Sequence, residues 1–175
     1  LSVTDILSSI YIFNSSNDFE VILSKGHCLL AWICILHEIG EISKEDLLNY
    51  YSNGARFAGH PKKGSSKSIT WGTGSLGHGL SVCCGKALAN PSKKYFCILG
   101  DGETNEGSIW EAALSASKHK LNNLKVLIDY NKIQSYGFVK EVLDLEPLKA
   151  KWESFGFDVS GINGHDINSL KKNLK

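Results

Sequence analysis

The 175 residues of this chain are enough for one domain with a sizeable hydrophobic core. Hydrophobic residues make up 42% and charged residues 21%, which is typical of a globular protein and excludes a disordered or fibrous one. The net charge is +1 and the Lys and Arg residues are scattered, so the sequence predicts no nucleic-acid surface and no anionic-membrane surface.

The five cysteines lie in apolar runs and form no C-x-x-C pair, which predicts buried thiols in a reducing compartment. No apolar run reaches the roughly 18 residues of a membrane helix. The N-terminus lacks the pattern of a signal peptide. We therefore expect a cytoplasmic protein. The chain contains no methionine, so we expect a fragment or a processed product, incomplete at both ends.

Helices and strands are predicted to alternate along the chain. In order, the patterns predict a helix (3–12), a strand (19–23), a buried helix (27–40), a short helix (43–51), a long Gly-, Ser- and Lys-rich connection (53–79), a helix (80–89), a strand (94–99), a helix (108–119), a strand (124–130), a helix (147–155) and a strand (157–162). The strands are continuously apolar, which indicates a mostly parallel sheet covered by helices on both faces. We expect a doubly wound α/β fold in a single domain over residues 1–175.

Oxygen-bearing side chains follow two of the predicted strands. The stretch ILGDGETNEG (98–107) places Asp101 directly after one strand, and LKVLIDY (124–130) leads to Asp129 and Asn131. Thirty residues separate Asp101 from Asn131, the length of one right-handed βαβ unit, so both should reach the same edge of the sheet. A carboxylate and an amide oxygen at that edge suit a hard ion such as Mg²⁺ (or Ca²⁺).

The glycines beside Asp101 have a physical purpose under this hypothesis. Gly100 allows the chain to turn off the strand, and Gly102 exposes backbone N–H groups that a side chain would hide from an anion. The helix predicted to begin near Ser108 directs its positive end toward the same region.

A second glycine-rich stretch, WGTGSLGHGLSVCCGKALA (71–89), leads into a helix. It contains GTGSLG, a literal match to the dinucleotide fingerprint G-x-G-x-x-G, so an NAD-binding Rossmann oxidoreductase is an alternative. The residues before the fingerprint make a poor core strand, which disfavours that alternative. Of the histidines, His27 and His60 stand next to glycine at loop edges and are better placed to reach a ligand than His37 or His119.

Several motifs together resemble the N-terminal, thiamine-diphosphate-binding portion of transketolase, over nearly the whole chain. They are SKGH (24–27), GHP (59–61), TGSLGHG (73–79), GDGETNEG with WEAA (100–113) and DYNKIQ (129–134), with support from LSVTDIL (1–7), LEPLKAKWESFGF (145–157) and INGHDI (162–167). Two departures stand out: His78 replaces a usual glutamine, and Lys62 replaces a common acid.

The resemblance implies roles for individual residues. Asp101, Asn131 and the backbone carbonyl of Ile133 would ligate Mg²⁺, and Gly102 and His27 would contact the diphosphate. Gly74, Ser75 and Leu76 would line the cofactor. His60 would move a proton at the sugar, and His27 and Glu106 would also belong to the catalytic site. Glu106 and Glu111 would couple two cofactor sites at a dimer interface.

The implied activity is transfer of a two-carbon ketol unit between sugar phosphates, a transferase reaction of carbohydrate and pentose phosphate metabolism. The pyrimidine-binding domain is expected to be absent, so the chain alone should be inactive. It would need a C-terminal transketolase subunit in a homodimer or heterotetramer. A catalytically inactive transketolase-like remnant is a further alternative.

Overall fold

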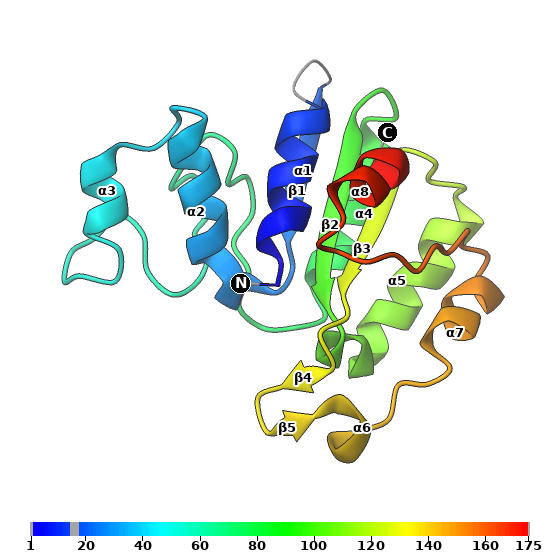
Figure 1. Cartoon of the computed structure of the whole chain (residues 1–175). Helices are drawn as coiled ribbons and strands as arrows, with labels where there is room; N and C mark the ends of the chain where they lie inside the picture. The colour runs from blue at the N-terminus through cyan, green and yellow to red at the C-terminus, as the bar shows by residue number, and fades with distance from the viewer. Residues whose placement is uncertain (1, 15–17, 175) are drawn as a thin grey trace.

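The computed structural model describes residues 2–14 and 18–174 (Figure 1). Among these residues, a three-stranded sheet lies at the centre, and helices lie on either side of it. In chain order the elements are α1 (Thr4–Asn14), β1 (Phe19–Leu23), the 3₁₀ turn η1 (Gly26–Cys28), α2 (Leu29–Glu38), α3 (Lys44–Leu48), α4 (Gly79–Ala89), β2 (Lys94–Gly100), η2 (Gly102–Asn105), α5 (Gly107–Lys118), β3 (Leu124–Asp129), β4 (Ile133–Gln134), β5 (Gly137–Phe138), α6 (Val139–Val142), α7 (Leu148–Ser154) and α8 (Ile167–Leu174).

The three strands are parallel and have the order β1-β2-β3. Leu23 pairs with Ile98, and Gly100 pairs with Asp129, so the three carboxyl ends lie at one edge. From Tyr95 onward β2 is buried at every residue, which explains its unbroken apolar sequence: both faces of this central strand are covered.

Alternate residues of β2 belong to two different hydrophobic clusters. Phe96 and Ile98 pack with residues of α1, α2 and α8, whereas Cys97 and Leu99 pack with residues of α4, α5 and α7. Because successive strand residues point to opposite faces, the two clusters lie on opposite sides of the sheet. This confirms the expected α/β fold with a parallel sheet flanked by helices.

The predicted elements agree with the structure within a few residues, with one clear error. Residues 157–162 form no strand; the segment has no regular structure and places Phe157 against Trp152 in an edge-to-face contact, with ring centroids 5.0 Å apart. Its alternating apolar residues pack against a helix, so they required no strand partner. The sequence patterns also gave no indication of β4, β5, α6 and α8.

Two expectations about burial were also inaccurate. Helix α2 is not covered all round, because Leu30 and Cys34 are exposed. The five cysteines are free thiols, as expected, but only Cys83, Cys84 and Cys97 are fully buried.

The long connection between α3 and α4 has no regular structure, yet it is anchored. Phe57 and Ile69 insert into the core, and the Glu41 carboxylate accepts hydrogen bonds from Ser68 N at 2.7 Å and from the hydroxyls of Ser66 and Ser68. These contacts tie the loop to the core and to the end of α2.

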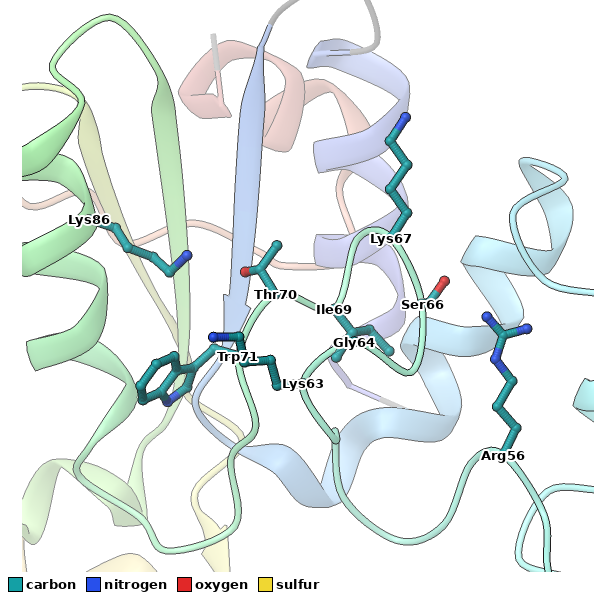
Figure 2. A pocket seen from close by; sticks show the side chains of 9 residues that line it. All are labelled: Arg56, Lys63, Gly64, Ser66, Lys67, Ile69, Thr70, Trp71 and Lys86. Atoms are coloured by element: carbon teal, nitrogen blue, oxygen red, sulfur yellow. The ribbon is translucent and has the colours of Figure 1, made fainter.

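A hollow of about 540 Å³ opens between this connection and α4 (Figure 2). Three of its cations have partners: Lys86 Nζ lies 2.7 Å from Glu20 Oε1, Arg56 Nη1 lies 2.8 Å from Asp46 Oδ2, and Lys63 Nζ lies 5.7 Å from the centroid of the Trp71 ring. Thr70 also donates to Glu20, in the first half of β1, so the hollow lies away from the carboxyl edge of the sheet. None of the helices in the described part of the chain has the length and apolar character to span a bilayer.

The two-sided burial of β2 predicts a large effect of truncation there. Leu99→Ala should lower the free energy of unfolding by about 2–5 kcal/mol, because Leu99 is 0% exposed and its removal leaves a cavity. The matched control Leu114→Ala, at a residue 60% exposed on α5, should change it by less than about 0.5 kcal/mol. Urea denaturation of both variants measures the difference, and equal effects would contradict the described packing.

Candidate functional site

The loops that follow β2 and β3 meet at the carboxyl edge of the sheet. The buried Asp101 carboxylate accepts hydrogen bonds from two backbone N–H groups: Gly102 N lies 2.8 Å from Oδ1, and Lys132 N lies 2.5 Å from Oδ2. The second bond joins Asp101 to the residue directly after Asn131. The expectation that the Asp101 and Asn131 segments share one edge is therefore met.

Burial is the main influence on Asp101, and it raises the pKa of this carboxyl. The N–H bonds from Gly102 and Lys132 and the charge of Lys25 act in the opposite direction. The carboxylate is thus a desolvated acid held by fixed donors, a setting in which a bound cation would favour the charged form.

Asn131 lies at the surface end of the same loop. Its Oδ1 accepts from Ile133 N at 2.9 Å, and the intervening Lys132 has a positive φ of 66°. A carboxylate, an amide oxygen and a nearby backbone carbonyl form a set of hard oxygen donors. Among the described residues no group of three or more His, Cys, Asp or Glu side chains is placed to hold a metal. The oxygen set expected here contains only one carboxylate and is of a different kind.

Asp129, the last residue of β3, has partners within the chain. Lys25 Nζ lies 2.8 Å from Asp129 Oδ2, and the Ser2 hydroxyl donates to the same oxygen at 2.6 Å. Both members of the Lys25–Asp129 pair are buried. The Lys25 stem passes over Gly100, where an added Cβ would lie 3.9 Å from Lys25 Cβ. That distance is an ordinary van der Waals contact, so the space over Gly100 would admit a methyl group.

Glu103 is the central buried acid of the site, and the sequence patterns gave it no role. Its Oε1 accepts from Gly77 N at 2.9 Å and from the Ser24 hydroxyl, and its Oε2 accepts from Gly100 N at 3.1 Å. One carboxylate therefore joins the turn after β1, the glycine-rich loop and the end of β2. The sequence feature that could have pointed to Glu103 is its place in GDGETNEG. It follows two glycines that expose N–H donors, and it precedes a helix.

Close backbone packing explains the glycines around these groups. An added Cβ on Gly102 would lie 2.9 Å from both Cβ and Oε1 of Gln134. An added Cβ on Gly79 would lie 2.8 Å from Ser24 Cα. Side chains at these two positions would force the loops apart.

The expected histidine motifs meet beside the same edge. An added Cβ on Gly26 would lie 2.7 Å from Thr73 Oγ1 and 3.1 Å from His60 Cδ2, so the turn before His27, the GHP segment and the TGSLG loop are in contact. The pKa of His27 is lowered by burial first, and then by the charges of Lys25 and His60. The imidazole of His27 is thus held toward its neutral form.

The remaining expected residues are distributed around this centre. Gly74 and Ser75 are exposed, and Leu76 is half-buried. An added Cβ on Gly74 would lie 3.7 Å from His60 Cδ2. Glu106 lies at the start of α5, beside Gly77. Glu111 lies apart, in a hollow of about 310 Å³ between α4 and α5.

The fingerprint GTGSLG (72–77) does not have the setting of a dinucleotide site. The residues before it are irregular, and β1 is separated from it by α2 and α3. A Rossmann fingerprint requires a strand directly before the glycines. The structure therefore removes the support for the NAD-binding alternative.

A parallel sheet with glycine-rich loops and acids at its carboxyl edge defines the class of α/β proteins that bind ligands at that edge. The family model described as "Transketolase, thiamine diphosphate binding domain" matches residues 14–175. The chain belongs to the transketolase family.

Relatives and solved structures agree with this assignment. The chain is 39% identical to a subunit of the apulose-4-phosphate transketolase of Actinobacillus succinogenes, over all of this chain and 68% of that relative. It is 38% identical to the subunit of the same name from Phocaeicola vulgatus, of which it covers 56%. Transketolase from Leishmania mexicana has the same fold, with a TM-score of 0.84 at 22% identity over 99% of this chain and 33% of that one. The chain thus spans about half to two thirds of the length of these two subunit relatives.

The bonding of Glu103 leads to a stability prediction. Glu103→Gln places an NH₂ group where at least one of the three donors needs an acceptor. The free energy of unfolding should therefore fall by about 1–3 kcal/mol. Glu153→Gln is the control, because Glu153 is exposed and makes one surface ion pair at 3.6 Å. Thermal and urea unfolding would compare them. A Glu103→Gln chain as stable as the control would show that the three-loop junction is unimportant.

Proposed function

We propose that this chain supplies the diphosphate-binding half of a transketolase. In this proposal Asp101, Asn131 and the carbonyl of Ile133 hold Mg²⁺, which holds the diphosphate of thiamine diphosphate. The observation that carries the proposal is the bond from Lys132 N to Asp101 Oδ2, which unites the two donor segments at the ligand-binding edge.

The donor set fits the proposed ion. Asp101 is a buried carboxylate that accepts from two backbone N–H groups, and the charges of Lys25 and Asp129 also act on it. Mg²⁺ prefers few protein oxygens and completes its shell with water or phosphate oxygens. A doubly charged cation would also offset the desolvation that raises the pKa of Asp101.

Other residues of the edge would bind and orient the cofactor. Gly102 and His27 would contact the diphosphate, and Gly74, Ser75 and Leu76 would line the space beside it. The contact of Gly26 with the GHP segment and with Thr73 supports this arrangement, because it brings the histidines and the glycine-rich loop together. Loops fixed to one another keep such groups oriented before ligand arrives.

Thiamine diphosphate supplies the carbanion chemistry of two-carbon transfer, while the protein contributes binding, orientation and electrostatics. His60 has an exposed imidazole beside Gly26 and Gly74, from which it would move a proton at the sugar. His27 would lie next to the diphosphate, where its imidazole N–H would donate a hydrogen bond. Glu106, at the start of α5, would face a neighbouring chain, with Glu111 on the same helix.

The complete enzyme would require a second chain. The bacterial relatives that align with this chain are named as subunits of a transketolase, which implies a complementary subunit. In this proposal the complementary subunit carries the pyrimidine-binding domain, in a heterotetramer that acts on sugar phosphates. The five free thiols favour a reducing compartment, so the proposed location is the cytoplasm.

Replacement of the proposed carboxylate ligand provides the direct test. Asp101→Asn should weaken Mg²⁺-dependent binding of thiamine diphosphate by at least about 100-fold. Loss of a residue that only supports a metal ligand weakens metal binding by up to about 100-fold, and Asp101 is a proposed ligand itself. Isothermal titration calorimetry on the complex with the pyrimidine-binding chain would measure it. Asp158→Asn, at an exposed site, is the control and should bind as the wild type does.

Two results would refute the magnesium site: equal affinity in Asp101→Asn and wild type, or binding that survives removal of Mg²⁺ by a chelator. A wild-type complex that binds no thiamine diphosphate would favour the inactive remnant instead.

The proposed role of His60 predicts a different kinetic pattern. His60→Ala should lower kcat of the reconstituted enzyme by about 10²–10⁴-fold, the usual contribution of a positioned acid or base. Cofactor affinity should stay unchanged. His119→Ala, at the exposed end of α5, serves as the control. Parallel losses of cofactor affinity and kcat in His60→Ala would instead assign His60 to cofactor binding.

A further inference from the structure

The side chain of Gln134 packs against the turn that carries Asp101. Gln134 lies in β4, directly after Ile133, in the segment to which β3 leads (Figure 1). An added Cβ on Gly102 would lie 2.9 Å from both Cβ and Oε1 of Gln134 and 3.3 Å from its Cδ. The carboxamide of Gln134 is therefore next to Gly102, where the hydrogen bond from Lys132 N to Asp101 joins the two loops.

Strand geometry directs this side chain into the protein. Ile133 is 59% exposed, whereas Gln134 is half-buried. Successive residues of a strand point to opposite faces, so an outward Ile133 requires an inward Gln134. The pairing of Gln134 with Gly137 in the β4–β5 ladder and the bond from Val139 N to Lys132 O at 3.0 Å hold the backbone in this orientation.

The Gln134 carboxamide has a donor that lacks an acceptor. Its Nε2 atom is buried, and no group in the described part of the chain accepts a hydrogen bond from it. A buried amide left unpaired costs free energy, so such groups in folded proteins nearly always bond to protein, water or a ligand. The donor at Gln134 therefore needs an acceptor that the described residues do not supply.

The position of this donor favours an anionic acceptor. Gly102, which the Gln134 side chain contacts, is the residue that would touch the diphosphate under the proposed function. Building on that function, we propose that Gln134 is a further cofactor-binding residue, whose NH₂ group donates a hydrogen bond to an oxygen of the diphosphate. An amide bond to a charged phosphate oxygen is stronger than one to a neutral acceptor.

The proposed bond has a second consequence for the same strand. Ile133 directly precedes Gln134, and its carbonyl is a proposed ligand of Mg²⁺. A diphosphate that holds the Gln134 side chain would also restrain the backbone that carries this carbonyl. Diphosphate and metal would then stabilise one arrangement of β4.

Replacement by methionine separates a binding role of Gln134 from a structural one. Gln134→Met keeps an unbranched side chain of similar length and removes the unpaired donor. Without ligand, the free energy of unfolding should stay the same or rise, because the carboxamide forms no hydrogen bond in the described part of the chain. Binding of thiamine diphosphate with Mg²⁺ should weaken by about 10- to 100-fold, the effect of losing a hydrogen bond to a charged group.

Urea denaturation of the chain would measure the first quantity, and calorimetry on the complex with the pyrimidine-binding chain the second. The matched control is Asn122→Met, which removes an exposed amide in the turn before β3, at the opposite end of that strand. This control should bind the cofactor as the wild type does. A second variant, Gln134→Ala, should weaken binding as Gln134→Met does, which assigns the loss to the missing amide.

Gln134 also offers a direct spectroscopic probe, because it is the only glutamine in the sequence. Labelling of this chain with ¹⁵N-glutamine gives one side-chain NH₂ group, observable by NMR in a complex with an unlabelled pyrimidine-binding chain. Its resonances should shift when thiamine diphosphate and Mg²⁺ are added together, and Mg²⁺ alone should leave them in place. A shift with Mg²⁺ alone would assign the amide to the water shell of the metal and overturn the diphosphate contact.

The remaining outcomes separate this proposal from the one it builds on. Equal cofactor affinity of the wild type and Gln134→Met would overturn the role of Gln134 and leave the magnesium site, tested by Asp101→Asn, intact. Lower stability of Gln134→Met with unchanged affinity would make Gln134 a structural residue. A wild-type complex that binds no thiamine diphosphate would remove the proposed function and the role of Gln134 together.

Discussion

The parallel pairing of β2 with β3 is the constraint on which the arrangement of the site depends. It sets Gly100 opposite Asp129, so the chain leaves both strands at the same edge and at the same level. Asp101 can then accept a hydrogen bond from Lys132 N across the two loops. A shift of one residue in this register would turn the apolar residues of β3 to the wrong face, so the buried clusters hold the register in place.

Buried charges beneath the edge convert this register into a defined site. The Lys25–Asp129 pair and the Glu103 carboxylate lie where water is excluded, and each is satisfied by specific partners. Burying such groups adds little net stability, because desolvation opposes their attraction. Loss of one partner is costly, however, so the three loops joined by Glu103 are confined to the arrangement that satisfies it. Fixed loops are what a cofactor site of the proposed kind needs.

Sequence reasoning succeeded where a local pattern corresponded to a physical requirement. The unbroken apolar run of β2 predicted burial on both faces, and the thirty-residue spacing predicted that Asp101 and Asn131 would share an edge. It failed where a pattern had two physical outcomes. The alternation after α7 satisfied packing against Trp152 rather than a strand ladder. The acids Glu103 and Asp129 are buried as Asp101 is, and the sequence patterns did not predict their partners, which are Ser24, Gly77 and Gly100 for Glu103 and Lys25 for Asp129.

The sequence alone determined the class of fold and the edge that carries the site, because period, strand length and glycine spacing are local properties of the chain. The tertiary structure decided which partners each of the three acids at this edge has. That choice depends on contacts between residues far apart in sequence, such as Lys25 with Asp129 and Ser24 with Glu103. Only the folded chain brings those partners together, because the pairing of the strands sets the distances between their ends.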